Sequence, residues 1–372
     1  MKILSVVGAR PQFVKLAPVA DACRGRKVEH IIVHTGQHYD PMLSDVFFAD
    51  LHIPDPDVHL DVGSAGHGAQ TGAILARMDE VLLEHRPDWV LVYGDTNSTL
   101  AGALSAVKLH LPVAHLEAGL RSFNRAMPEE HNRVLTDHAA DLLMAPTQVA
   151  MDHLANEGLA ARSTLVGDVM VDVLMKVRSE LTDPEAVMAD LGLERGSFSI
   201  ATIHRAENTD DPARLAGIIQ GLQQVDHPVV LLAHPRLRAR ALAQGLDLHG
   251  GSLSVRDPLP YPALVGAVDA ARGVVTDSGG LQKEAFALRT PCTTVRSETE
   301  WVETVELGWN VLIDPRTATA DDIARAASRP HPTSTDATPY GDGLAATAVL
   351  DALETTPSPT TAGEPYTRRV GR

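Results

Sequence analysis

The chain has 372 residues, a length that favours two domains with substantial cores and excludes a peptide or a disulfide-stapled mini-protein. Apolar residues make up 44% of the composition and charged residues 22%, which excludes wholesale disorder. The formal net charge of −16 has the wrong sign for binding a nucleic acid or an anionic membrane surface.

The cysteine content and the N-terminal sequence indicate a reducing compartment. Cys23 and Cys292 are the only cysteines, too few for a disulfide framework or a cysteine-rich zinc site. The first apolar run is short and is broken by Gly8 and Pro11, and no later run reaches the roughly 20 apolar residues of a membrane span. We therefore expect a soluble cytoplasmic protein without a targeting segment.

Short aliphatic runs alternate along the chain with longer amphipathic stretches, as in a parallel sheet covered by helices on both faces. In the first half, the predicted strands are residues 2–7, 28–34, 89–93 and 112–116, with a last run at 165–166. After a helical stretch the pattern restarts, with predicted strands at 198–203, 229–233, 253–255, 273–276 and 292–295.

These runs predict an α/β protein with two domains. The predicted units are an N-terminal domain at 1–168, a C-terminal domain at 169–354 and a disordered tail, rich in Pro and Thr, at 355–372. Open α/β sheets bind ligands at the carboxyl ends of their strands, so two such edges facing each other form a cleft for a ligand.

The first predicted strand leads into a turn with two cations. Arg10 precedes Pro11, which is suited to the first position of a helix, and Lys15 follows about one turn later. The amides and dipole of a helix N-terminus add to these charges and favour an anion. The alternative is a strand-to-helix turn with surface charges, and the glycines of a dinucleotide-binding fingerprint are absent.

Acidic residues follow the next predicted strands. Asp95 comes directly after the strand at 89–93, although an Asp at this position alone is more typical of a helix N-cap. Glu117 ends the following strand, and Glu129 and Glu130 open a later helix, where one of the two compensates the helix dipole. Carboxylates that converge in a cleft raise one another's pKa, so acid and base roles become available.

Arg121 lies between Glu117 and Glu129, and Arg133 follows Glu130. The simple interpretation of both arginines is pairing with these acids, and the alternative for Arg133 is substrate binding.

In the second half, polar residues again follow predicted strands. His204 and Arg205 come after the strand at 198–203, and His234 has the same placement after the next strand. The segment from Ser278 to Gly280 is a turn between a strand and a helix, and its amides can bind a diphosphate.

Two further residues accompany this glycine turn. Glu284, one turn into the helix, is suited to bind a ribose diol, and Arg296 is placed to line the cleft. The spacing excludes a P-loop. Although 17 histidines are present, none has convincing metal-ligand spacing, so we predict no catalytic metal and no cofactor.

The chain resembles the non-hydrolysing UDP-N-acetylglucosamine 2-epimerase family over roughly residues 1 to 352. The resemblance rests on the ordered motifs GARPQFVKLAP, HTGQHYD, VYGDTNSTLAG, HLEAGLRS, PEEHNR, TIHRAEN, TDSGGLQKEAF and TEWVETVELGWN. It implies a GT-B-like fold with two Rossmann-like domains, a last helix that crosses back to the first domain, and a homodimer. It also implies reversible inversion at carbon 2, which converts UDP-N-acetylglucosamine to UDP-N-acetylmannosamine for cell-surface polysaccharides.

The resemblance also implies roles for individual residues. The catalytic residues of the family fall on Asp95, Glu117, Glu129 and His204. The implied substrate-binding residues are Arg10, Lys15, Arg133, His234, Ser278, Gly279, Gly280, Glu284 and Arg296. In bacterial members a second UDP-sugar is an allosteric activator, and Gln37, His38, Gln70 and His234 lie where such contacts are expected. Position 12 is Gln where many members have Glu.

The acidic and cationic residues named above are suited to a reaction in which UDP is eliminated from the sugar. The proton on carbon 2 is barely acidic until the diphosphate begins to leave carbon 1, so we expect loss of UDP to a glycal followed by re-addition. A carboxylate takes the proton, and Arg10, His204 and the glycine turn stabilise the diphosphate. The alternatives are a hydrolysing epimerase that releases free N-acetylmannosamine, a glycosyltransferase, and a catalytically silent UDP-sugar sensor.

Overall fold

The computed structural model describes residues 1–36, 53–181, 187–189 and 192–357, and these form two compact units. Unit 1 consists of Met1–Val173 together with the segment that begins at Pro339. Unit 2 is Leu174–Thr338, so the division falls within helix α7 (Val169–Glu180).

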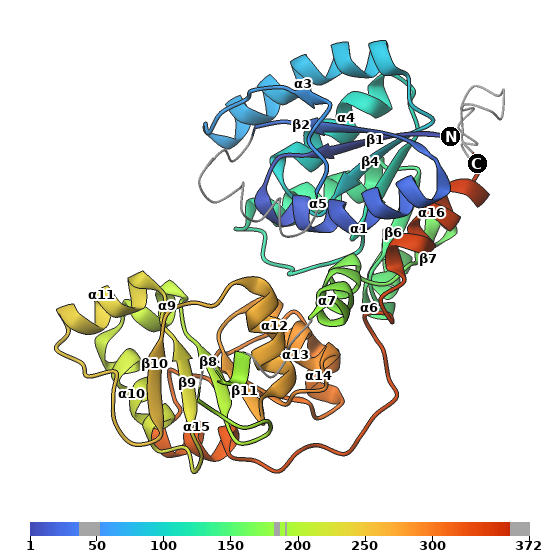
Figure 1. Ribbon diagram of the computed structural model, residues 1–372. Coiled ribbons are helices and arrows are strands. Elements are labelled where there is room, and N and C mark those ends of the chain that lie inside the picture. Colours follow the sequence, from blue (N-terminus) through green and yellow to red (C-terminus); the bar gives the residue numbers. More distant parts are fainter. Residues whose placement is uncertain (37–52, 182–186, 190–191, 358–372) are drawn as a thin grey trace. The chain divides into compact units, whose positions relative to one another are not determined.

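Unit 1 contains a seven-stranded parallel sheet (Figure 1). Its strands are β1 (Lys2–Val7), β2 (Glu29–His34), β3 (Val58–His59), β4 (Trp89–Tyr93), β5 (Val113–Leu116), β6 (Leu142–Ala145) and β7 (Ser163–Leu165). The order is β3-β2-β1-β4-β5-β6-β7, in which the chain reverses its direction of winding between β1 and β4. This is a Rossmann-like arrangement, and such reversal points are where open α/β sheets bind ligands.

The helices of unit 1 connect these strands and cover the sheet. They are α1 (Arg10–Arg26), α3 (His67–His85), α4 (Asn97–Lys108), α5 (Pro128–Ala139), α6 (Gln148–Asn156), a short 3₁₀ helix (Ala160–Arg162) and α16 (Ala345–Thr355). All five residues of β4 are buried, and α4 presents small buried residues such as Ala101 and Gly102. Gly102 lies against Val6 of β1, so the helix approaches the sheet closely.

Unit 2 repeats this arrangement with six parallel strands. They are β8 (Ser199–Thr202), β9 (Val229–Leu232), β10 (Leu253–Arg256), β11 (Gly273–Thr276), β12 (Cys292–Thr294) and β13 (Asn310–Leu312). The order β10-β9-β8-β11-β12-β13 places the reversal between β8 and β11. The helices are α9 (Ala206–Thr209), α10 (Pro212–Gln223), α11 (Pro235–Ala243), α12 (Tyr261–Ala270), α13 (Gly279–Ala287), α14 (Val302–Glu306) and α15 (Ala320–Ala327).

The predicted class, an α/β protein with two doubly wound Rossmann-like domains, is confirmed by these two sheets. Strands β3, β6 and β13 were not predicted. The two residues of β3 form no recognisable apolar run. Strands β6 and β13 have four and three residues, as many as the predicted strands β9 and β12, and were missed despite that length.

Helix α16 packs on unit 1 beside α1, as Figure 1 shows (red and dark blue). The Trp89 Nε1 donates a hydrogen bond of 3.1 Å to the carbonyl of Leu353, and Asp172 accepts from the amides of Ala345 and Ala346 at 3.0 and 2.7 Å. A carboxylate at a helix N-terminus binds otherwise unpaired amides. The last helix is therefore an integral part of the first unit.

In the part of the chain that the structure describes, every helix is too short or too polar to cross a lipid bilayer.

Helix α10 offers a matched pair of glycines for a stability test. A Cβ at Gly221 would lie 2.8 Å from Ile323 Cβ and 2.9 Å from the Ala320 carbonyl of α15, whereas a Cβ at Gly217 meets nothing within 4 Å. We expect Gly217→Ala to stabilise unit 2 by about 0.5–1 kcal/mol through helix propensity. Gly221→Ala should destabilise it by about 1–3 kcal/mol through overpacking. Thermal unfolding of the two variants measures the difference, and equal shifts would contradict the packing of α10 on α15.

Candidate active site

Gln12 connects the two turns at the reversal point of unit 1 by hydrogen bonds. This buried side chain accepts hydrogen bonds from the amides of Gly8 at 2.8 Å and Ala9 at 3.0 Å. It donates to the Tyr93 carbonyl at 2.8 Å and to Thr99 Oγ1 at 3.0 Å. The amide group is suited to this position because it has both an acceptor and a donor. Gln12 therefore joins the turn after β1 to the turn after β4.

Lys15 and Glu117 form an ion pair at this edge of the sheet. Both side chains are 14% exposed, and Glu117 has a left-handed backbone with φ 72°. A Cβ on Gly94 would lie 3.1 Å from Glu117 Oε2 and 3.3 Å from Lys15 Nζ, so glycine leaves room for the pair. Burial alone lowers the pKa of Lys15, but Glu117 outweighs it and raises that pKa.

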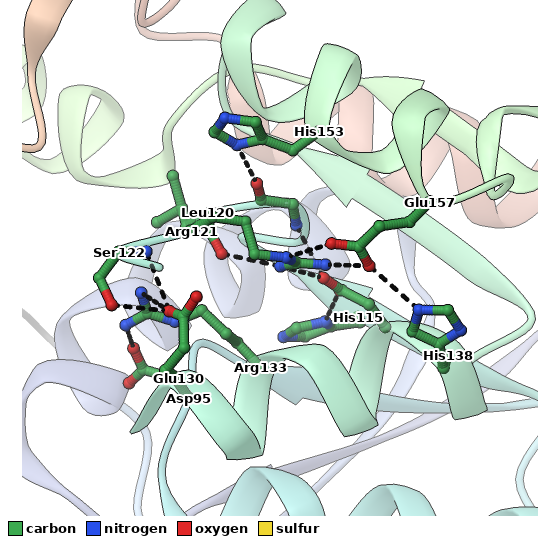
Figure 2. A network of polar contacts seen from close by, with 12 residues as sticks. Asp95, His115, Leu120, Arg121, Ser122, Glu130, Arg133, His138, His153 and Glu157 are labelled. Atoms are coloured by element: carbon green, nitrogen blue, oxygen red, sulfur yellow. Dashed lines mark hydrogen bonds and ion pairs between the residues drawn. The ribbon is translucent and has the colours of Figure 1, made fainter. Parts of the chain in front are cut away.

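A second ion pair joins Arg133 of α5 to Asp95, which follows β4 (Figure 2). The other arm of Arg133 lies 3.1 Å from Glu130 Oε2. The N-cap of α4 is Thr96, whose hydroxyl accepts from the Thr99 amide at 3.3 Å. The interpretation of Asp95 as that N-cap is wrong, because the next residue supplies the capping oxygen and leaves the Asp95 carboxylate to Arg133.

The two acids at the start of α5 differ in their surroundings. Glu130 is 5% exposed and accepts from Ser122 N at 2.9 Å, Ser122 Oγ at 2.8 Å and Phe123 N at 2.9 Å. Glu129 is partly exposed. Glu130 therefore holds the loop before α5, a larger role than the dipole compensation that the sequence suggested for one of these acids, and Glu129 is the one open to solvent.

Gln70, one of the predicted activator contacts, is linked to Asp95 through two asparagines. Asn97 donates to Gln70 Oε1 at 2.8 Å, and Asn132 Nδ2 contacts Asn97 Oδ1 at 3.3 Å and the Asp95 carbonyl at 2.9 Å. The sequence analysis missed both asparagines, although each stands in a quoted motif. Gln37 and His38 lie outside the described residues, as does the Arg10 side chain, whose backbone begins α1.

His115, also missed, is fully buried in β5. Its Nδ1 lies 2.6 Å from Asp137 Oδ1 and its Nε2 lies 2.7 Å from the Gly94 carbonyl oxygen. Asp137 also contacts Arg121, which binds Glu157 with two hydrogen bonds, and Figure 2 shows this network. The sequence signal that could have identified His115 is a histidine within a run of otherwise apolar residues, which form the buried strand β5.

In unit 2, the fully buried Asp277 holds the loop that carries His204. Its carboxylate accepts from the amides of His204 at 3.1 Å and Arg205 at 3.0 Å, and from Asn208 Nδ2 at 3.0 Å. The His204 Nδ1 lies 3.1 Å from the same carboxylate, and the His204 side chain is 49% exposed. Burial alone raises the pKa of Asp277, but these donors hold it below its ordinary value. The sequence analysis assigned Asp277 no role.

The glycine turn, Ser278 to Gly280, forms the start of helix α13, and its amides differ in their hydrogen-bond partners. The Ser278 amide donates to Thr276 Oγ1 at 3.0 Å, and its contact with an anion stays a prediction. Gly279 and Gly280 are the first residues of α13, where helix geometry leaves amides without an intrahelical acceptor. Tyr261 donates to Glu284 Oε1 at 2.9 Å.

The two remaining predicted residues of unit 2 have partners within that unit. Arg296 is 4% exposed and binds Glu300 through both guanidinium arms, at 3.0 and 2.9 Å. His234 is exposed and caps α11, accepting from the Arg236 amide at 3.3 Å. Across the described residues, no group of three or more His, Cys, Asp and Glu side chains could hold a metal ion.

Three comparisons with known proteins bear on the function of these residues. The family model described as UDP-N-acetylglucosamine 2-epimerase matches residues 21–354. A relative from Pseudomonas aeruginosa, named UDP-2,3-diacetamido-2,3-dideoxy-D-glucuronate 2-epimerase, is 46% identical over 95% of this chain and 99% of its own.

Solved structures agree with the family match. The structure of the Methanocaldococcus jannaschii UDP-GlcNAc 2-epimerase has a TM-score of 0.83 and 35% identity, and covers 95% of this chain and 99% of its own. The structure of the same enzyme in complex with UDP-GlcNAc and UDP has a TM-score of 0.77, 36% identity and the same coverage. These matches confirm the predicted GT-B-like fold class.

Glu130 and Glu129 are adjacent in the chain, but we expect their substitution to have unequal effects on stability. Glu130→Gln replaces an acceptor of three hydrogen bonds and an ion pair, so we expect the free energy of unfolding to fall by about 1–3 kcal/mol. Glu129→Gln, the matched control, should change it by less than about 0.5 kcal/mol. Chemical denaturation measures both, and equal losses would contradict the assignment of Glu130 to the loop.

The contribution of Glu130 to stability should depend on pH. Burial alone raises the pKa of Glu130, but Ser122, Phe123 and Arg133 hold it below its ordinary value. Its contribution to stability is therefore complete above the unfolded pKa and is lost as the pH falls through the folded pKa. Denaturation at acidic pH should show a smaller loss of stability in Glu130→Gln than in the natural protein.

Proposed function

The chain belongs to the UDP-N-acetylglucosamine 2-epimerase family, and from this premise we propose that it reversibly inverts carbon 2 of a UDP-linked 2-acetamido sugar. The observation that carries the proposal is the pair of carboxylates, each beside a cation, at the reversal point of unit 1. Glu117 is held by Lys15 and Asp95 by Arg133, at the edge where such sheets bind ligands.

The reaction proceeds by elimination and re-addition. A carboxylate of unit 1 takes the proton from carbon 2 while the bond from carbon 1 to the diphosphate oxygen breaks, and the electron pair of the C–H bond becomes the double bond of a glycal. UDP then adds back to carbon 1, and a proton returns to carbon 2 from the opposite face. Asp95, Glu117 and Glu129 are the three carboxylates for these proton transfers, which contribute about 10²- to 10⁴-fold each.

The leaving diphosphate is bound by unit 2. The first amides of α13 stabilise the negative charge that develops on the leaving oxygen, and His204 adds a cation when protonated. Asp277 orients His204 through Nδ1, so Nε2 is the ring nitrogen that reaches the phosphate. Glu284, oriented by Tyr261, accepts from the ribose hydroxyls.

UDP-N-acetylglucosamine is the first candidate substrate, because the family description and the bound relative name it. The second is UDP-2,3-diacetamido-2,3-dideoxy-D-glucuronate, which is supported by 46% identity to the Pseudomonas aeruginosa epimerase over 95% of the chain. The two sugars react at the same carbon and differ at carbons 3 and 6. The homodimer and the activating second UDP-sugar remain predictions from the resemblance.

Deuterium incorporation tests the mechanism. In deuterated water, the 2-epimer and the recovered substrate should both carry deuterium at carbon 2, because the proton exchanges with solvent in the glycal state. Proton NMR of each candidate UDP-sugar, incubated separately, reads both the epimer and the exchange. Retention of the original hydrogen would rule out elimination, and phosphorus NMR that shows stoichiometric UDP would indicate a hydrolysing enzyme. Binding without turnover of either sugar would indicate a sensor.

Three substitutions test which carboxylates transfer protons in the reaction. Asp95→Asn, Glu117→Gln and Glu129→Gln should each lower kcat by at least about 100-fold, because each removes a carboxylate that moves a proton. Calorimetric binding of UDP should stay within about threefold, because none of the three carboxylates is assigned to the diphosphate. Glu84→Gln, at an exposed position of α3, is the matched control and should retain full activity. Full activity in any of the three variants removes that residue from the mechanism.

A further inference from the structure

The ring of His115 is placed between two hydrogen-bond acceptors. Nε2 faces the Gly94 carbonyl oxygen at 2.7 Å and Nδ1 faces Asp137 Oδ1 at 2.6 Å, with the side chain fully buried. A carbonyl oxygen only accepts, and so does an ionised carboxylate. If Asp137 is ionised, both ring nitrogens must therefore carry a proton, and the ring is an imidazolium.

The surroundings of Asp137 favour its ionised form. Its second oxygen, Oδ2, lies 2.7 Å from Arg121 Nη1 and 3.1 Å from the Gly119 amide, and both of these groups are donors. Burial alone raises the pKa of Asp137, whereas the Arg121 guanidinium lowers it. The two donors at Oδ2 do not involve His115, and they favour the ionised carboxylate.

The charges of this cluster balance. His115 and Arg121 supply two cations, and Asp137 and Glu157 supply two anions, with Arg121 bound to Glu157 at 2.7 and 2.9 Å. His138 of α5 also lies 3.0 Å from Glu157, at a half-exposed position. A buried ion is tolerated where such partners and hydrogen bonds compensate its charge.

The imidazolium connects segments that carry the proposed catalytic carboxylates. Gly94 immediately precedes Asp95, and Glu117 follows His115 by two residues in the same strand segment. The Gly94 amide donates to the Leu116 carbonyl of β5 at 3.0 Å, so Gly94 is bound to β5 through both its amide and its carbonyl. Asp137 lies one helical turn after Arg133, which binds Asp95.

We propose that His115 is a positioning residue that is doubly protonated near neutral pH and holds the turn of Asp95 against the strand segment of Glu117. Asp137 compensates its charge and fastens α5 to the same point. The charge state follows from the contacts alone, whereas the effect on turnover rests on the proposed function.

Nitrogen NMR of the intact, histidine-labelled protein tests the charge state. At about pH 7, both ring nitrogens of His115 should have the shifts of protonated nitrogens. His30 is the matched control within unit 1. It is partly buried beside Ser5 and its desolvation lowers its pKa to about 4, so one of its nitrogens should be unprotonated. The variants His115→Gln and His30→Gln assign the signals. An unprotonated ring nitrogen on His115 would overturn the proposal.

A second spectrum tests the contact with Gly94 without any substrate. Carbonyl-labelled glycine with nitrogen-labelled aspartate gives signals only from Gly–Asp pairs, which are Gly94–Asp95, Gly167–Asp168 and Gly341–Asp342. In His115→Phe the Gly94 carbonyl signal should move, because its charged donor is lost, while the other two signals stay in place. An unmoved Gly94 signal contradicts the contact.

The turnover number kcat tests whether His115 positions the carboxylates of unit 1. His115→Gln should lower kcat by about 10- to 100-fold, with UDP binding within about twofold, because the carboxylates shift while the diphosphate contacts do not. The double variant His115→Gln with Asp137→Asn should recover part of kcat, since the two amides can bond each other and remove the uncompensated charge. Full kcat in folded His115→Gln overturns the role in turnover. If the natural protein epimerises neither sugar, the proposed function fails, and the two spectra still decide the charge and the contact.

Discussion

Charge compensation at the carboxyl edge of the first sheet is the constraint on which the candidate site depends. Cations from other segments lie beside the partly buried carboxylates there, Lys15 from α1 and Arg133 from α5, and compensate their charge. The acids therefore keep their positions only while α1 and α5 keep theirs. Gln12 and Glu130 secure those two helices to the neighbouring turns, so residues without a chemical role determine the geometry of those that have one.

The two units use the same topology for different tasks. Each has its polar residues at the point where the strand order reverses, between β1 and β4 in unit 1 and between β8 and β11 in unit 2. Unit 1 presents carboxylates paired with cations, which suit proton transfer. Unit 2 presents the first amides of α13 and a histidine fastened by Asp277, which suit a phosphate group. Under the proposed function, proton removal and departure of the leaving group are thus assigned to separate units.

The sequence predicted the fold class because strands such as Trp89–Tyr93 are continuous apolar runs followed by polar turns. It allowed the pairing of Arg133 with the acids, which the structure confirms for Asp95 and Glu130. It could not predict the pair of Lys15 and Glu117, since these residues are 102 positions apart and nothing local connects them. Local preference left Asp95 and Thr96 as competing caps of α4, and the structure assigns the cap to Thr96. The difference between Glu129 and Glu130 depends on the path of the loop through Ser122, which no periodicity describes.

The contribution of α16 to unit 1 has a consequence for the order of synthesis. Trp89 is buried, and its indole nitrogen bonds to the carbonyl of Leu353, 264 residues later in the chain. The ribosome completes unit 2 before it makes this helix, so the nascent first unit emerges with the α16 contact surface uncovered. Its final packing must wait until the ribosome has made α16, and the interval in between is when a chaperone has that apolar surface to recognise.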